Sequence, residues 1–226
     1  MAPAEPLHQV EAALVERAVE TRRHEFAVGR QCARRALARF NVTGVPLLAG
    51  PDRAPLWPEG LLGSITHTLA GPAGFCGAAV AARRDVAALG IDAEGIDPLP
   101  SACWDLVLTE VEKRRLGGEP EAGRLAKLVF VAKEAVFKAL FPTVGRILEF
   151  RDVQVDLAPA GDGFVAEVLS QPETLPPRIP ACAGRFAVGD HIAIAAVVMP
   201  ADGNPRLGPY QPGWAPPPSE ERLVRP

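Results

Sequence analysis

The chain has 226 residues, of which 48% are hydrophobic and 23% are charged, the composition of a globular protein that can bury a sizeable core. Its formal net charge of -3 argues against a general binder of nucleic acid or of anionic membranes. No apolar run is long enough to cross a bilayer, and residues 1–6 lack the basic and apolar regions of a secretion signal. We therefore expect a cytoplasmic protein that binds neither nucleic acid nor membrane.

Residues 10–40 carry apolar side chains at helical spacing, which predicts helices with one apolar face. The same stretch holds a dense run of arginines on an otherwise acidic chain: Arg22, Arg23, Arg30, Arg34, Arg35 and Arg39. Forked guanidinium groups recognise phosphates, so this run is a candidate phosphate-binding surface. For any single arginine, the alternative is a solvated helix face.

A loop and two short strands follow. Residues 41–58 are rich in Gly and Pro, which predicts a long irregular connection with Arg53 in a turn. Residues 61–68 predict a strand that ends in small hydroxyls and His67, and residues 75–82 predict its neighbour. A lone histidine is usually a hydrogen-bonded structural residue. Because strands joined by short turns usually pair, we expect the next strand to lie in the same sheet.

That next strand ends in two acids. The apolar run before Gly90-Ile91-Asp92-Ala93-Glu94 predicts a buried strand in which Asp92 and Glu94 point the same way. Two carboxylates held so close repel each other, and a divalent cation is the simplest compensation for hard oxygen ligands. Asp92 and Glu94 are therefore candidate magnesium ligands. The alternative is an ordinary strand that runs into a solvated loop.

Residues 123–140 give the strongest helix signal in the chain, with one apolar stripe, and Pro142 is expected to end the helix. Glu134 lies nearly opposite the stripe, yet two phenylalanines flank it on the helical wheel. We therefore expect Glu134 and Lys138 to face a cleft or another layer of the protein. The alternative is a simple salt bridge at i, i+4 spacing.

The rest of the chain predicts a second half. A helical pattern covers residues 99–120. The expected strands, which pattern as an antiparallel sheet, are 150–157, 164–169, 185–188 and 192–198. Residues 199–226 are rich in Pro and Gly and predict a tail. We divide the chain into an N-terminal half at 1–100, a C-terminal half at 101–198 and the tail.

Four cysteines are spread through the chain without a C-x-x-C pair: Cys32, Cys76, Cys103 and Cys182. This pattern predicts neither a zinc site nor a disulfide framework. We expect reduced and mostly buried thiols.

The ordered features are a basic helix, a Gly-Ser-Ile-Thr-His strand, the Gly-Ile-Asp-Ala-Glu strand and the helical motif Lys133-Glu134-Ala135-Val136-Phe137-Lys138-Ala139. This order, over about residues 17–198, resembles the Sfp-type 4'-phosphopantetheinyl transferases. The basic segment from Arg22 and the Trp57-Pro58 loop most resemble the subgroup that serves polyketide and nonribosomal peptide synthases, in siderophore and antibiotic biosynthesis.

The resemblance implies a pseudo-twofold α+β fold, with two similar halves of helices on small antiparallel sheets and coenzyme A bound between them. It implies Mg²⁺ ligands at Asp92, Glu94 and Glu134. It implies contacts to coenzyme A from Arg22, Arg30, Arg53, His67, Lys133 and Lys138. Many relatives carry lysine where this chain has Arg53.

The implied reaction transfers the 4'-phosphopantetheine group of coenzyme A to a serine of apo acyl or peptidyl carrier proteins and releases adenosine 3',5'-bisphosphate. Glu134 is the candidate base for the serine proton, with Lys138 beside it as the second catalytic residue. The carrier protein is expected to dock after Glu94, at Trp104 and residues 106–115. Because two halves are fused in one chain, we expect a monomer.

Two other functions fit the same residues less well. One is a different magnesium-dependent phosphotransferase that uses a free nucleotide, and the other is a non-catalytic coenzyme A-binding protein.

Overall fold

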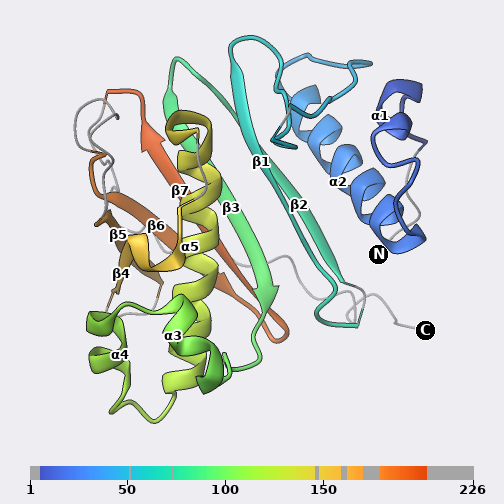
Figure 1. Cartoon of the computed structure of the whole chain (residues 1–226). Helices are drawn as coiled ribbons and strands as arrows, with labels where there is room; N and C mark the ends of the chain where they lie inside the picture. Colours follow the sequence, from blue (N-terminus) through green and yellow to red (C-terminus); the bar gives the residue numbers. More distant parts are fainter. Residues whose placement is uncertain are drawn as a thin grey trace, which may run out of the picture.

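The computed structural model describes residues 6–50, 52–72, 74–145, 148–158, 162–169 and 179–202. They form an α+β protein with two antiparallel sheets (Figure 1), so the expected class is confirmed. One sheet is a hairpin of β1 (Leu61–Thr68) and β2 (Phe75–Ala82). The other has five strands in the order β3 (Val86–Gly95), β7 (Ile192–Pro200), β6 (Cys182–Val188), β5 (Gly163–Val168) and β4 (Val153–Leu157). The helices and 3-10 turns are α1 (Gln9–Ala13), α2 (Glu20–Ala38), η1 (Ser101–Cys103), α3 (Trp104–Val107), α4 (Glu110–Leu116), α5 (Ala122–Val144) and η2 (Phe150–Asp152).

The helix α2 packs on the hairpin, mainly on β2 (Figure 1). Its buried side includes Val28, Ala33 and Leu37, so the amphipathic helix expected in residues 10–40 is present. The segment before α2 is fixed by the buried carboxylate of Glu11, which accepts a hydrogen bond from the backbone N–H of Leu47 at 2.8 Å. A buried carboxylate must be paired in this way because its desolvation is costly.

The expectation that β3 joins the hairpin in one sheet is wrong. The backbone of β3 pairs with β7 in the five-stranded sheet. β1 still runs beside β3 (Figure 1), but side chains replace the backbone ladder between them. The hydroxyls of Ser64 and Thr66 accept hydrogen bonds from backbone N–H groups of β3 at 3.1 and 2.9 Å. These hydroxyls satisfy the free edge of β3, so the hairpin can lie beside the sheet without joining it.

The close packing of α5 on β3 depends on Gly90. A Cβ atom at this position would collide with the carbonyl of Ala135 and lie 2.6 Å from the backbone nitrogen of Ala139. Glycine therefore lets the helix backbone lie directly against the strand. The face of α5 that carries Glu134 and Lys138 is thereby brought close to the acidic end of β3.

The expected end of α5 at Pro142 is also wrong. The helix continues through Pro142 and ends at Gly145, which has a φ of 66°. A proline in the last turn removes one helical hydrogen bond, whereas a left-handed glycine satisfies the last carbonyls and ends the helix.

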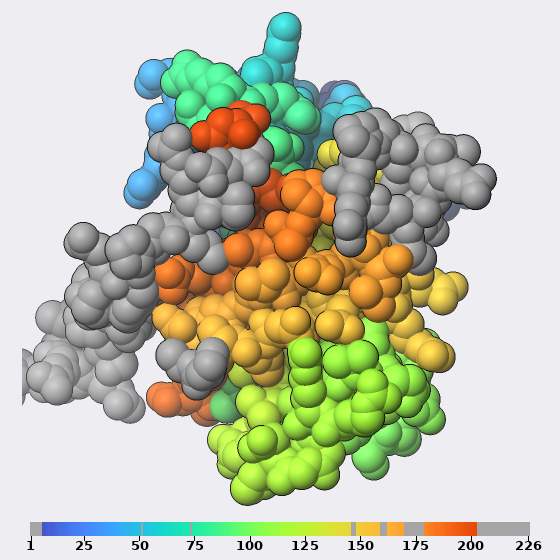
Figure 2. Space-filling model, turned by 90° about the vertical axis from the view of Figure 1, so that its left-hand side faces the viewer, coloured from blue at the N-terminus to red at the C-terminus, as the bar shows by residue number. Residues whose placement is uncertain are grey.

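The other expected strands are present, with ends shifted by a few residues. The helical pattern in residues 99–120 is split into η1, α3 and α4, and Thr109 caps α4 by accepting a hydrogen bond from the backbone of Glu112 at 3.2 Å. Figure 2 shows the strands β4 to β6 across the middle of one face, with the segment around α4 below them. From residue 203 on, the predicted tail lies outside the described residues.

In the part of the chain that the structure describes, no helix is both long and apolar enough to span a membrane. All four cysteines are free thiols, as expected, but only Cys182 is fully buried.

Candidate active site

Asp92 is the centre of the candidate site. It lies near the end of β3 and is 4% exposed. Its Oδ1 accepts hydrogen bonds from Lys138 Nζ at 2.6 Å and from Thr66 Oγ1 at 3.1 Å. Its Oδ2 is buried and has no hydrogen-bond partner among the described residues. A buried carboxylate oxygen is costly when it is left unsatisfied, so this oxygen is available for a ligand.

Glu94 and Glu134 complete an acidic cluster with Asp92. Burial raises the pKa of Glu94, and the charge of Asp92 raises it further. Burial also raises the pKa of Glu134, with added repulsion from Asp92 and Glu94 that the charge of Lys138 partly offsets. The structure therefore brings together the three acids that the sequence singled out, although they come from two elements far apart in the chain.

The acidic cluster fits a divalent cation whose coordination shell would be completed by oxygen atoms of the substrate. No group of three or more His, Cys, Asp or Glu side chains in the described ranges is arranged as a ready metal cage. Magnesium, however, usually takes one or two protein carboxylates together with waters and substrate phosphate oxygens. An all-oxygen donor set, in which Oδ2 of Asp92 is buried and has no partner in the described part of the chain, matches that requirement.

On the other side of β1, α2 carries a cationic group, Arg22 and Arg30, and Glu25 of the same helix contacts His67 of β1. Arg30 is 5% exposed, its guanidinium stacks over the ring of Phe26 at 4.2 Å, and burial lowers its pKa. Its Nε is buried and has no hydrogen-bond partner among the described residues. Arg22 and His67 both donate to the same oxygen of Glu25, at 3.4 and 3.1 Å. This group has the charge and the spare donor that an anionic ligand requires.

Arg53 stands apart from these residues. It is exposed and has a φ of 66°, and its backbone N–H donates to the carbonyl of Gly50 at 2.9 Å. Its side chain makes no hydrogen bond or ion pair within the described ranges. A contact from Arg53 to a phosphate stays a prediction.

The expected phosphate contact of Lys133 is wrong. Its side chain is fully buried, and its Nζ donates to Glu112 at 2.7 Å and to the backbone carbonyls of Val107 and Phe150 at 2.8 and 2.9 Å. These three acceptors use all three ammonium donors, so none is left for a ligand. Lys133 lies on a different side of α5 from Glu134, because adjacent helical residues point about 100° apart.

Three nearby residues were missed by the sequence analysis. Thr66 bonds Asp92, Glu25 bonds His67, and the charge of Lys127 lowers the pKa of Glu94. Helical spacing gave a signal for Lys127, which lies seven residues before Glu134 and hence on the same face of α5. Thr66 had no such signal, since its partner is on a strand that it does not pair with.

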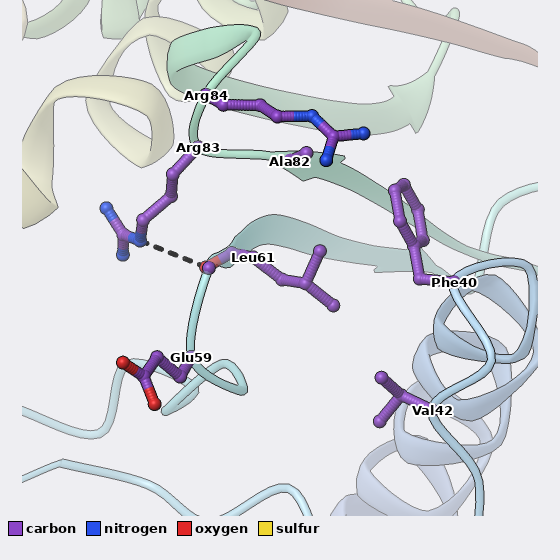
Figure 3. Close-up of a pocket in the computed structure, with 8 residues that line it drawn as sticks. Phe40, Val42, Glu59, Leu61, Ala82, Arg83 and Arg84 are labelled. Atoms are coloured by element: carbon purple, nitrogen blue, oxygen red, sulfur yellow. Dashed lines mark hydrogen bonds between the residues drawn. The ribbon is translucent and has the colours of Figure 1, made fainter.

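A cavity of about 350 Å³ lies elsewhere, at the opposite end of the hairpin from Thr66 and His67 (Figure 3). It is lined by Phe40, Val42, Glu59, Gly60, Leu61, Ala82, Arg83 and Arg84. None of the predicted site residues lines it, so it forms no part of the candidate site.

Two family models match most of the chain. The family model of the 4'-phosphopantetheinyl transferase N-terminal domain matches residues 10–81, and that of the 4'-phosphopantetheinyl transferase superfamily matches residues 88–189. The chain is 40% identical over 204 residues to the 4'-phosphopantetheinyl transferase Svp of Streptomyces mobaraensis, covering 88% of this chain and 81% of that protein.

Two further relatives match over similar lengths. The identity to the 4'-phosphopantetheinyl transferase PptT of Mycobacterium tuberculosis is 36% over 195 residues, covering 84% of each chain. The identity to the 4'-phosphopantetheinyl transferase Npt of Nocardia iowensis is 34% over 199 residues, covering 84% of this chain and 88% of that protein. The chain therefore belongs to the 4'-phosphopantetheinyl transferase family, and the resemblance drawn from its motifs is confirmed.

Proposed function

We propose that this transferase moves the 4'-phosphopantetheine group of coenzyme A onto a serine hydroxyl of apo acyl or peptidyl carrier proteins, with Mg²⁺ held by Asp92, Glu94 and Glu134. The observation that carries this proposal is the state of Asp92, which has one oxygen fixed by two donors and the other buried without a partner among the described residues. Two glutamates of raised pKa lie beside it.

Coenzyme A would bind across β1. The phosphates of its adenosine end fit the cationic group on α2, where the Nε of Arg30 has no partner among the described residues and the side chains of Arg22 and His67 contact Glu25. A bound phosphate would compete with Glu25 for these donors, since charge-assisted hydrogen bonds to phosphate are strong. The pyrophosphate would then lie toward the acids, with Lys138 on the same side.

The transfer forms a bond between the serine oxygen and the β-phosphorus of coenzyme A. It breaks the bond from that phosphorus to the bridging oxygen, which leaves on adenosine 3',5'-bisphosphate. The bound cation would neutralise charge on the pyrophosphate oxygens. Lys138 adds a positive charge at the same place, as phosphoryl transfer requires.

Glu134 is our candidate for the group that takes the serine proton, directly or through one water. Burial and two neighbouring acids raise its pKa, so as a carboxylate it is a better proton acceptor than an exposed glutamate. Lys138 keeps a positive charge next to this proton transfer and limits the repulsion among the acids.

The carrier protein would dock on α3 and α4. Leu106 is 68% exposed there, and Arg114 makes no ion pair within the described residues. The neighbouring cations are already engaged, Lys113 with Asp105 and Glu110, and Arg115 with Asp156. An exposed apolar side chain on α3 and an exposed arginine on α4 suit an acidic helix of a partner. Action as a monomer in the cytoplasm belongs to the same proposal.

The test is a mass-shift assay. Purified enzyme is incubated with coenzyme A and an apo peptidyl carrier domain, with Mg²⁺ or with a chelator, and the carrier is weighed by mass spectrometry. The expected result is a phosphopantetheine mass gain on the carrier serine that the chelator abolishes. A mass gain that the chelator leaves unchanged would contradict the cation, and modification from a nucleoside triphosphate instead of coenzyme A would favour the other phosphotransferase.

A further inference from the structure

Two hydroxyls of β1 hold the free edge of β3. Ser64 Oγ accepts a hydrogen bond from the backbone N–H of Ile91 at 3.1 Å and donates to its carbonyl at 3.5 Å. Thr66 Oγ1 accepts from the backbone N–H of Ala93 at 2.9 Å. The two residues are 5% and 1% exposed. In both cases a hydroxyl satisfies a backbone donor that a neighbouring strand would otherwise pair.

Only Thr66 also reaches a carboxylate. Because its oxygen accepts from Ala93, its single proton is directed to Oδ1 of Asp92, 3.1 Å away. Lys138 donates to the same oxygen at 2.6 Å. The two donors fix the carboxyl plane, and Oδ2 is the oxygen left buried without a partner in the described part of the chain.

The next residue links this arrangement to the cationic group on α2. Successive side chains of a strand point to opposite faces, so Thr66 faces β3 while His67 faces α2 and bonds Glu25 at 3.1 Å. Of two adjacent residues of β1, Thr66 therefore contacts the acidic cluster and His67 contacts α2. A threonine also has a restricted χ1 angle, which suits a group that must hold one direction.

We propose that Thr66 is a positioning residue for the transfer reaction, whose hydroxyl turns Asp92 so that Oδ2 faces the cation. This inference rests on the proposed function, because it assumes that Asp92 is a cation ligand. Groups that hydrogen-bond a metal ligand typically change metal affinity by about 10–100-fold when removed. The hydroxyl of Thr66 acts on Asp92 in this way without touching the cation.

The test compares three variants with the wild-type enzyme in the presence of coenzyme A. Thr66→Val removes the hydroxyl and keeps the shape, and Thr66→Ser restores the hydroxyl. Ser64→Ala is the matched control, since it breaks the same kind of bridge to β3 without affecting a carboxylate. The readout is the Kd for Mn²⁺, measured by the electron paramagnetic resonance signal of the free ion, with the thermal midpoint of each variant recorded beside it.

The expected result is a Kd for Mn²⁺ about tenfold higher in Thr66→Val, and near the wild-type value in Thr66→Ser and Ser64→Ala. An unchanged Kd in Thr66→Val would overturn the proposal. So would an equal rise in Thr66→Val and Ser64→Ala, because the effect would then come from the bridge and not from Asp92.

Asp92→Asn separates this inference from the proposed function. A higher Kd in Asp92→Asn together with an unchanged Kd in Thr66→Val would refute only the role of Thr66. An unchanged Kd in Asp92→Asn would refute the cation site itself, and the inference would fail with it.

Discussion

Two lysines five residues apart on α5 each form an ion pair with an acid, but one pair is fully buried and the other is partly exposed. Lys133 and Glu112 are 0% and 1% exposed, and three acceptors use every donor of the ammonium group. The side chains of Lys138 and Asp92 are 32% and 6% exposed, and one carboxylate oxygen of that pair has no partner among the described residues. The first pair is closed and joins α5 to α4 and η2. The second pair is open, because Oδ2 of Asp92 and the partly exposed Lys138 can still contact a ligand.

This difference teaches that motif position alone does not identify a functional lysine. Both lysines belong to the same sequence motif, and both pair with an acid. A closed pair is costly to bury and fixes the elements that it joins. An open pair leaves an unsatisfied polar group that can bind a ligand.

Glu134→Gln should lower the transfer rate by about 10²–10⁴-fold, since it removes the proposed base and one carboxylate of the open site. Because Glu134 is half-buried and makes no structural ion pair within the described ranges, the fold should remain intact. The measurement is the initial rate of carrier modification, with circular dichroism to check folding. Glu121→Gln, on an exposed residue at the start of the same helix, is the control and should keep the wild-type rate.

Lys133→Met should destabilise the fold by about 3–5 kcal/mol, because it leaves the buried Glu112 without its countercharge. Lys138→Met should destabilise the fold less, because Lys138 is partly exposed and Thr66 keeps its hydrogen bond to Asp92, and its main effect should be a lower transfer rate. Urea denaturation measures the first effect and the carrier assay the second.

The double variant Lys133→Met with Glu112→Gln should recover part of the lost stability, since it removes the stranded charge. If Lys138→Met destabilised the protein as much as Lys133→Met, the distinction between a closed and an open pair would be incorrect.

Gly90→Ala should destabilise the protein by about 1–3 kcal/mol, because the added methyl group meets the backbone of α5 at Ala135 and Ala139. Displacement of α5 would separate Glu134 from Asp92, so the transfer rate should fall as well. Gly118→Ala is the matched control, as nothing lies within 4 Å of a Cβ atom there. Equal stability of the two variants would argue against close packing of α5 on β3.

Cys182 shows what burial does to an ionisable group that has no countercharge. Burial raises its pKa to about 11 from the usual 9.0, so the folded state favours the protonated thiol. Its contribution to stability is complete below pH 9.0 and is lost as the pH rises to about 11, by about 3 kcal/mol. Urea denaturation under reducing conditions at alkaline pH measures this loss.

Cys182→Ala should make the alkaline loss smaller. A smaller loss should persist in this variant, because the pKa of Cys76 is also raised, to about 12. A pH dependence that is identical in both proteins would exclude Cys182 as its source.

Arg114→Glu should have the smallest effect, raising the KM for the carrier about fivefold, or ~1 kcal/mol, with no change in the KM for coenzyme A. Arg124→Glu, on an exposed residue that pairs with Glu121, is the control outside the proposed docking surface. Equal changes in both KM values would indicate a general defect rather than a docking role for Arg114.

Much of the fold could be predicted from the sequence. The strands β1 and β2 were expected with the bounds that the structure shows, because alternation and turn residues are local signals. The sheet to which β3 belongs could not be predicted, since that choice depends on which distant strand supplies its backbone partners. The β7 strand that does so lies about a hundred residues later in the chain.

The sequence by itself determined the candidate acids and the family, because residue types at fixed spacing on one strand and one helix already define their faces. Only the tertiary structure decided which lysine is open and which is closed, and that Thr66 reaches Asp92. The physical reason is that helical or strand period fixes the direction of a side chain relative to its own element. What that side chain meets depends on elements that come together only when the chain packs.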